Sequence, residues 1–166
     1  VDSVDPTPRQ AFGDLDGVSL PMRRLFAILE QVAPTESTVL VEGETGTGKE
    51  LGAWALHQAS PRRSGPFVVF DCGAVPPALV ESELFGHVRG AFTGATGDRP
   101  GAFVRADGGT LFIDELNSLP LELQPKLMRA LESRTVKPVG SAVPRPLNVR
   151  IVAAGDAEDD CLIRLF

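Results

Sequence analysis

The stretch GETGTGKE, residues 43–50, most restricts the folds open to this chain of 166 residues. Its glycines and Lys49 match the pattern G-x-x-x-x-G-K. The pattern is informative where a strand precedes it and a helix follows it. Both conditions are met, because TVLVE (38–42) is a short apolar run and LGAWALHQAS (51–60) continues as a helix. This order predicts the first unit of a parallel α/β fold, rather than a glycine turn followed by a solvated lysine.

Phosphate binding is the chemistry that such a loop performs. Glycines let consecutive backbone N–H groups converge on phosphate oxygens, and the helix start adds partial positive charge. We expect Lys49 to reach the β and γ phosphates. Glu50 stands where the general motif has the Ser or Thr that meets Mg²⁺, so other groups must hold the metal in part. The expected nucleotide-binding residues here are Gly43, Glu44, Thr45, Gly46, Thr47, Gly48, Lys49 and Glu50.

Strands and helices alternate along the rest of the chain. Helical spacing of Met22, Leu25, Phe26, Leu29 and Val32 predicts a first amphipathic helix. Further strands are predicted at 66–70, 109–114 and 147–154, and further helices at 76–85 and from Pro120 onward. The predicted fold is a three-layer α/β domain with a mainly parallel sheet and helices on both faces. Residues 1–11 are predicted to be a linker, because they are acidic and broken by prolines.

Composition excludes several classes of protein. The net charge of −6 argues against a nucleic-acid surface, which depends largely on Lys and Arg. Apolar runs are too short for a membrane, and the first residues lack the basic start and apolar run of a signal peptide. Cys72 and Cys161 have no metal-ligand spacing and are expected to be reduced thiols. A cytoplasmic protein is expected.

A second candidate site follows the strand predicted at 109–114, which ends in Asp114 and Glu115. The carboxyl ends of parallel strands meet at one edge, so both acids would face a bound nucleotide. Asp114 would support Mg²⁺, usually through water, and Glu115 would orient and polarise an attacking water. The alternative is a strand that meets a solvated turn, but the distance of about 65 residues from the phosphate loop favours the functional interpretation.

The stretch HVRGAFTGAT (87–96) is too glycine-rich to be a good helix or strand, so core packing does not explain it. Together with the phosphate loop and the acidic pair, it resembles the central AAA+ ATPase domain of sigma-54-dependent transcription activators, the bacterial enhancer-binding proteins. The resemblance covers nearly the whole chain. Six residues match the signature loop of that family without a substitution: Gly90, Ala91, Phe92, Thr93, Gly94 and Ala95.

The resemblance implies a ring-forming P-loop ATPase, typically hexameric, with ATP and Mg²⁺ as ligands. Hydrolysis would move the signature loop against sigma-54 bound to RNA polymerase and so remodel closed promoter complexes, with no direct DNA contact from this domain. Phe92 and Thr93 would make the sigma contact, and the family commonly has Glu at position 50. Residues 132–147 resemble a second surface insertion, although Lys137 and Arg145 could equally be ordinary solvated charges. The residues placed at the adenine ring are Asp16, Gly17 and Val18.

Four departures from the family bear on activity. Asp71 stands where an Asn usually holds the catalytic Glu in check. Gly155 and Asp156 replace the Thr–Asn pair that senses the γ-phosphate. The family has two arginines that reach into the neighbouring subunit. Arg164 is a weak match for the second of them, and Glu158 lies near the position of the first. The helical lid subdomain is absent, so the domain is expected to span 12–166 and to be truncated at its C-terminal end.

Two functions therefore remain open. One is an ATPase core that remodels the sigma-54 holoenzyme, and the other is a nucleotide-binding interaction module with little or no turnover. A small-molecule kinase would leave the signature loop unexplained and would need an acceptor pocket that no stretch of the sequence indicates.

Overall fold

A parallel four-stranded sheet forms the centre of the computed structural model, which describes residues 4–44 and 46–155. The strand order is β3-β8-β5-β4, and each neighbouring pair is parallel. The mainly parallel sheet predicted from the sequence is therefore confirmed. The bounds of the strands are β3 Val39–Glu42, β4 Phe67–Asp71, β5 Thr110–Asp114 and β8 Arg150–Gly155.

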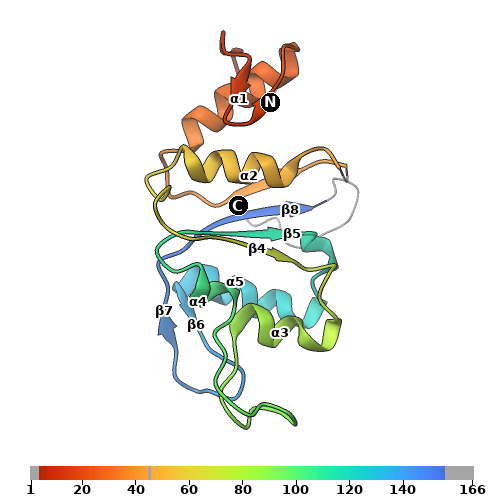
Figure 1. Cartoon of the computed structure of the whole chain (residues 1–166), viewed down its shortest axis with the longest axis vertical. Coiled ribbons are helices and arrows are strands. Elements are labelled where there is room, and N and C mark those ends of the chain that lie inside the picture. Colours follow the sequence, from red (N-terminus) through yellow and green to blue (C-terminus); the bar gives the residue numbers. More distant parts are fainter. Residues whose placement is uncertain (1–3, 45, 156–166) are drawn as a thin grey trace.

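Helices cover both faces of this sheet (Figure 1). α1 and α2 pack on one face, and α3, α4 and α5 lie on the other. The bounds of the helices are α1 Leu20–Val32, α2 Lys49–Gln58, α3 Pro77–Phe85, α4 Ala102–Arg105 and α5 Gln124–Ser133. The molecule thus has the three layers that the alternating pattern predicts.

Strand β5 shows how the sequence builds two cores. Its residues are apolar on both faces, as expected for a strand in the middle of a parallel sheet. Successive side chains point to opposite faces. Leu111 and Ile113 pack into the core against α3 to α5, while Phe112 packs into the core against α1 and α2. All three are completely buried.

Two antiparallel ribbons extend from the central layers. β1 Ala11–Phe12 pairs with β2 Leu15–Asp16, and β6 Thr135–Val136 pairs with β7 Arg145–Pro146. The second ribbon lies beside the loop between α3 and α4, at the end of the molecule farthest from α1 (Figure 1).

Some elements differ from the sequence-based expectation. The helix expected at Pro120 begins with the 3-10 turn Leu121–Leu123, and a second 3-10 turn covers Leu116–Ser118. Helix α4 was not expected, because four residues carry too little periodicity. Part of the stretch predicted to be a linker contacts α1, since the Nε of Arg23 donates to the Thr7 carbonyl at 2.7 Å.

The amino-terminal edge of the sheet is closed by a buried arginine. Arg150 begins β8 and is 2% exposed. Its guanidinium donates to the carbonyls of Val32 at 2.9 Å, Ala33 at 2.8 Å and Ser37 at 3.3 Å. The last carbonyls of a helix have no partner within the helix and carry partial negative charge, so Arg150 satisfies the end of α1.

A second arginine joins the loops at the same edge. Arg62 contacts both carboxylate oxygens of Glu36, at 2.6 and 2.8 Å to Oε2 and 3.2 Å to Oε1. It also donates to the carbonyl oxygen of Asn148 at 2.7 Å and to its side-chain oxygen at 2.6 Å. The hydrogen bond from Arg62 is the main reason that the pKa of Glu36 lies below its ordinary value.

His57 predicts a pH dependence of stability. The ring is buried, contacts the Thr110 hydroxyl at 2.9 Å and stacks on Trp54. Burial lowers its pKa below the ordinary value of 6.5, so the unfolded chain binds the proton more readily. The contribution of neutral His57 to the free energy of unfolding is fully present above pH 6.5. It is lost as the pH falls through the lowered pKa, by at most about 1.4 kcal/mol per pH unit.

Denaturant unfolding between pH 7 and 5 would measure this effect. We expect His57→Gln, which does not titrate and can still hydrogen-bond to Thr110, to lose less stability over that interval than the unmodified chain. Glu36 does not interfere, because its depressed pKa moves its effect to pH values below 4.5. Equal slopes in the two proteins would contradict the assignment to His57.

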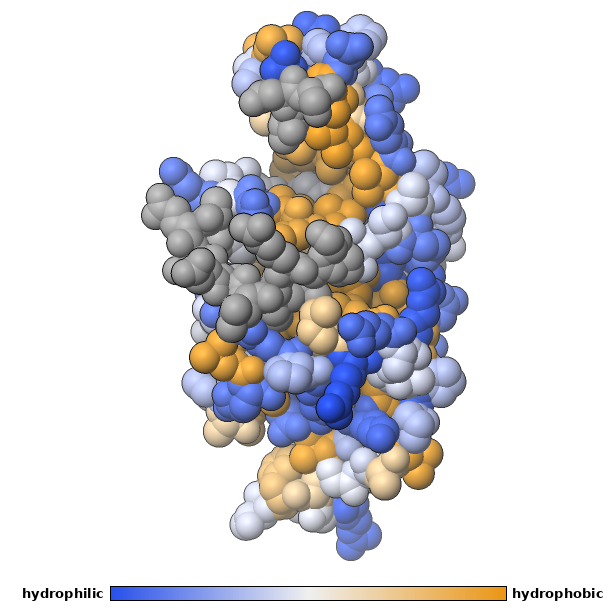
Figure 2. Space-filling model, turned by 180° about the vertical axis from the view of Figure 1, so that it is seen from behind, coloured by the Kyte–Doolittle hydropathy of each residue, from blue (hydrophilic) through white to orange (hydrophobic). Residues whose placement is uncertain are grey.

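Apolar side chains on the surface are mostly dispersed. On the face opposite the view of Figure 1, the largest apolar area lies between the α1 end and the middle of the molecule (Figure 2). In the described part of the chain, no helix is long and apolar enough to cross a membrane.

Candidate nucleotide site

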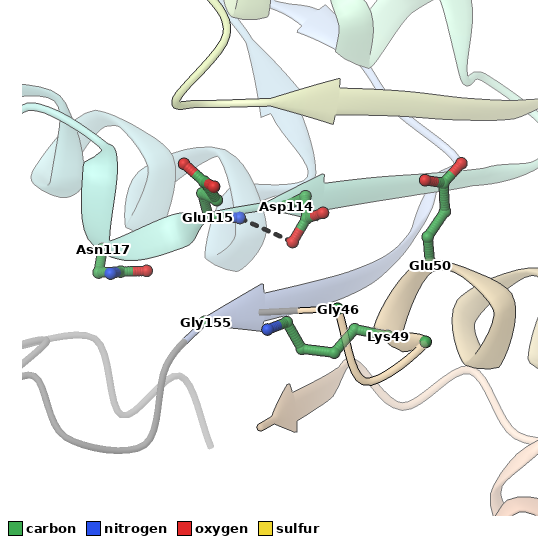
Figure 3. A pocket seen from close by; sticks show the side chains of 8 residues that line it. Gly46, Lys49, Glu50, Asp114, Glu115, Asn117 and Gly155 are labelled. Carbon is green, nitrogen blue, oxygen red and sulfur yellow. Dashed lines mark hydrogen bonds between the residues drawn. The ribbon is translucent and has the colours of Figure 1, made fainter. Parts of the chain in front are cut away.

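The carboxyl ends of the four central strands meet at one edge, opposite Arg150. Asp71 and Asp114 are directly paired at the ends of β4 and β5, and Glu42 is paired with Gly155 at the ends of β3 and β8. A cavity of about 300 Å³ opens at this edge (Figure 3). Its lining residues come from the phosphate loop, the β5 end and the β8 end: Gly46, Gly48, Lys49, Glu50, Asp114, Glu115, Asn117 and Gly155.

The phosphate loop connects β3 to α2 as the sequence predicts. Gly46 and Gly48 have φ of 83° and 85°, a left-handed conformation that side chains rarely adopt. Gly48 caps α2, and Lys49 is the first helical residue. The Nζ of Lys49 donates to the carbonyls of Gly43 and Glu44, the latter at 3.1 Å. Lys49 therefore lies over its own loop, and reaching a phosphate requires its ammonium to exchange these carbonyls for phosphate oxygens.

Asp114 and Glu115 occupy the sharp turn at the end of β5. Asp114 Oδ1 accepts the Glu115 N–H at 2.9 Å. Glu115 has φ of 47°, which is uncommon for a residue with a side chain and costs backbone energy. In Figure 3 the Glu115 carboxylate points away from Lys49. Ser118 Oγ lies 3.5 Å from Glu115 Oε2, at the long limit of a hydrogen bond.

Asp71 has its own hydrogen bonds at the neighbouring strand end. Its Oδ1 accepts the N–H groups of Gly73 at 2.8 Å and Ala74 at 3.1 Å. These bonds close a turn after β4, and the turn brings Gly73 against the Glu115 carboxylate. Asp71 and Glu115 are thus close neighbours, as the sequence predicts for the position where the family usually has Asn.

The local charge at this edge is negative. The pKa of the buried Cys72 thiol is raised to about 12, first by burial and then by the charges of Asp71, Asp114 and Glu115. A bare polyphosphate would be repelled by the same field. A divalent cation that accompanies the phosphates would be attracted.

The metal ligands expected from the sequence are only partly arranged. Asp114 supplies a carboxylate at the cavity, which suits a hard cation such as Mg²⁺. Glu50 also lines the cavity, but its carboxylate does not point toward Asp114 (Figure 3). Among the residues described, no three His, Cys, Asp or Glu side chains cluster to hold a metal ion. Such a site fits Mg²⁺ that also takes ligands from phosphate and water.

The residues predicted at the adenine ring lie on and just after the β1–β2 ribbon. Asp16 and Val18 are exposed, and neither they nor Gly17 are among the lining residues of the cavity. Leu15 of the same ribbon reaches the phosphate loop instead, because its methyl groups lie about 4.0 and 3.9 Å from the Cβ positions at Gly48 and Gly52. Leu15 was not predicted from the sequence, although its place beside Asp16 was a signal.

The signature loop lies between α3 and α4 and projects from the end of the domain farthest from α1 (Figure 1). Gly90 and Gly94 have φ of 78° and 99°, and no atom would obstruct a side chain at either position. Backbone conformation rather than space therefore accounts for these glycines. Phe92 is 41% exposed, and its ring meets His87 edge-on at 4.9 Å between centroids. Thr93 is exposed beside it.

The base of the signature loop is hydrogen-bonded to the segment between β6 and β7. The N–H of Val88 donates to the Val139 carbonyl at 3.1 Å, and the N–H of Val139 donates to the Gly86 carbonyl at 2.8 Å. Gly140 packs against Ala91 so closely that a Cβ there would lie 2.8 Å from the Ala91 Cβ. The two segments that the resemblance identifies as surface insertions are therefore in direct contact.

Several predicted positions fall outside the described residues: Thr45, Asp156, Glu158, Cys161 and Arg164. One further cavity residue, Asn117, was missed. Its signal was a polar amide among leucines, two residues after Glu115. Gly155, at one position of the Thr–Asn pair of the family, lines the cavity. It has no side chain with which to contact a phosphate.

One protein family matches nearly the whole chain, including the residues that line the cavity. A family model described as "Sigma-54 interaction domain" matches residues 15–164. HyfR, a DNA-binding transcriptional activator of Escherichia coli (strain K12), is 54% identical over 142 residues, which cover 86% of this chain and 21% of HyfR. DctD, a C4-dicarboxylate transport transcriptional regulatory protein of Rhizobium meliloti (strain 1021), is 46% identical over 91% of this chain and 35% of DctD. The chain thus spans about a fifth to a third of these relatives.

Solved structures agree with this result. NtrX from Brucella abortus in complex with ATP superposes with a TM-score of 0.77 at 36% identity, over 86% of this chain and 30% of NtrX. The P-loop NTPase domain of a sigma-54 transport activator from Escherichia coli has a TM-score of 0.52 at 24% identity, over 84% of this chain and 77% of that domain, and supports the fold.

Proposed function

This chain belongs to the Sigma-54 interaction domain family, and we propose that it is the ATP-binding core of a sigma-54-dependent activator. In this proposal, ATP hydrolysis at the cavity drives remodelling of the closed complex of sigma-54 and RNA polymerase. The observation that carries the proposal is the exposed Phe92 in an unaltered signature loop, on the same domain as the phosphate loop. In this proposal, the active unit is a ring of several copies of the protein. The AAA+ domain covers residues 12–166.

ATP binding is proposed for the cavity at the carboxyl edge of the sheet. The backbone N–H groups of the phosphate loop and the ammonium of Lys49 would hold the phosphates. The adenine would lie toward the β1–β2 ribbon, near Leu15 and Gly17. The structure of NtrX with ATP supports this assignment, because its fold covers most of this chain.

Hydrolysis is assigned to the acidic pair. Mg²⁺, when bound, would neutralise charge that develops on the phosphates, and Asp114 would hold it directly or through water. Glu115 would accept a hydrogen bond from the attacking water and so orient it. Its carboxylate must first leave its present position, because it points away from Lys49 (Figure 3).

Sigma-54 binding is assigned to the signature loop. Phe92 offers a compact aromatic anchor, and Thr93 adds a hydroxyl beside it. The left-handed glycines on both sides allow the backbone to change its course. The hydrogen bonds to Val139 would pass such a movement to the second insertion.

Phe92→Ala tests this function. With ADP and a transition-state phosphate mimic present, we expect sigma-54 to bind the unmodified chain and binding by Phe92→Ala to fall at least about tenfold, since buried aromatic anchors at interfaces contribute about 2 kcal/mol or more. Co-migration in gel filtration or fluorescence anisotropy would measure the affinity. ATP affinity should stay unchanged, because no residue of the signature loop lines the cavity.

Leu121→Ala is the matched control. Leu121 is also apolar and exposed, at 68%, but lies outside both insertions. Its replacement should leave sigma-54 binding as it is. Equal binding by the Phe92 variant and the unmodified chain would refute the role of the loop.

A further inference from the structure

Gly73 lies where a side chain would collide with Glu115. A Cβ at Gly73 would overlap Oε2 of Glu115 and lie 2.9 Å from its Cδ. The only other atom among the nearest neighbours is Asp71 Oδ1, at an ordinary contact distance of 3.4 Å. The space that the Glu115 carboxylate occupies therefore exists because residue 73 has no side chain.

Among the residues that the structure describes, no close hydrogen-bond donor explains why the Glu115 carboxylate rests there. Ser118 Oγ is at the long limit of a hydrogen bond, 3.5 Å away. Asp71 is a carboxylate too, and its Oδ1 already accepts two backbone N–H groups of its own turn. Two neighbouring carboxylates repel when both are ionised. The shape of the turn at Gly73, rather than a partner, therefore admits Glu115.

The cavity offers the alternative position. Glu115 also lines the 300 Å³ space that Lys49 and Asp114 border. Its backbone is fixed by the left-handed turn at the end of β5, so only the side-chain torsions are free to choose between the two positions. A carboxylate displaced from Gly73 would move toward the phosphate side of the turn.

We propose that Gly73 is a positioning residue that lets Glu115 rest away from the phosphates and thereby limits hydrolysis. The inference rests on the proposed ATPase function and adds a regulatory element to it. The Glu115 carboxylate lies away from the phosphates because the turn at Gly73 leaves room for it. A side chain at residue 73 would fill that room and move the carboxylate back toward the phosphates.

Gly73→Ala tests the inference directly. Gly73 has no left-handed φ, so alanine brings no backbone strain, and the atom that must move is the end of a flexible side chain. We expect kcat for ATP to rise about 3- to 10-fold, as the competent position of Glu115 becomes more populated, with KM unchanged. In the Glu115→Gln background the same substitution should produce no rise. Gly97→Ala is the matched control, because Gly97 has no neighbour within 4 Å and no left-handed φ.

A crystal structure of Gly73→Ala provides a readout that does not depend on turnover. The Glu115 carboxylate should lie on the Lys49 side of the β5 turn. An unchanged carboxylate position, or an unchanged or lower kcat in a protein that does hydrolyse ATP, would overturn the inference. If neither protein exceeds Glu115→Gln in turnover, the proposed hydrolysis fails together with the limit on it, and the crystal structure alone then decides whether Gly73 sets the position of Glu115.

Discussion

Glu115→Gln is expected to lower ATP turnover by about 10²- to 10⁴-fold, the range that a positioned general base contributes. The amide of Gln keeps the size of the side chain but cannot take a proton from the attacking water. Binding of ATP should persist or tighten slightly, since one negative charge leaves an edge that is already acidic enough to help raise the Cys72 pKa. A coupled assay of phosphate release, at several chain concentrations with and without Mg²⁺, would measure the loss.

The neighbouring acids provide the controls for this variant. Glu50→Gln should have a much smaller effect on turnover, because the Glu50 carboxylate does not point toward Asp114 (Figure 3). Equal turnover by Glu115→Gln and the unmodified chain, with ATP binding retained in both, would contradict hydrolysis at this site. That outcome would favour the nucleotide-binding interaction module instead.

Arg150→Met is expected to lower the free energy of unfolding by about 3–5 kcal/mol, the range reached when a buried hydrogen-bond network is broken. Methionine can fill a similar volume, but it donates no hydrogen bond. The carbonyls of Val32, Ala33 and Ser37 would each lose a charged donor at a site where Arg150 is 2% exposed. Denaturant unfolding followed by circular dichroism would measure the change.

Arg9→Met is the matched control for this stability measurement. Arg9 pairs with Glu30 at 3.3 Å, but its side chain is 70% exposed. Exposed ion pairs contribute about 0–1 kcal/mol, so the control should change stability little. A loss of less than about 1 kcal/mol in Arg150→Met would show that water replaces the missing donors.

Much of the fold could be predicted because it depends on short-range pattern. The run TVLVE, the glycine loop and the helix after it carry their own signals, and the acids at the end of β5 follow from the strand before them. Helix α4 could not be predicted, since four residues give no usable periodicity. Arg150 could not be predicted either, because its acceptor Ala33 is 117 positions away in sequence.

Most of the residues that line the cavity were predictable from the sequence, but their geometry was less so. The order of strand and loop places Lys49 and Asp114 at one edge, whichever rotamers they adopt. The direction of the Glu115 side chain depends on its left-handed backbone and on Gly73, which lies on another strand's turn. No local pattern encodes such a contact. The same holds for the hydrogen bond from Val88 to Val139, which joins segments about fifty residues apart.

Strand β8 begins at Arg150 and ends at Gly155, so a single strand connects the arginine-sealed edge to the nucleotide cavity. The contacts of Arg150 that hold the end of α1 and the residues that line the cavity are thereby separated along the strand axis. A substitution at the cavity edge, such as one at Asp71, is therefore expected to leave the anchor of α1 intact. The residues of the cavity can therefore change over evolution while the scaffold and the signature loop stay intact.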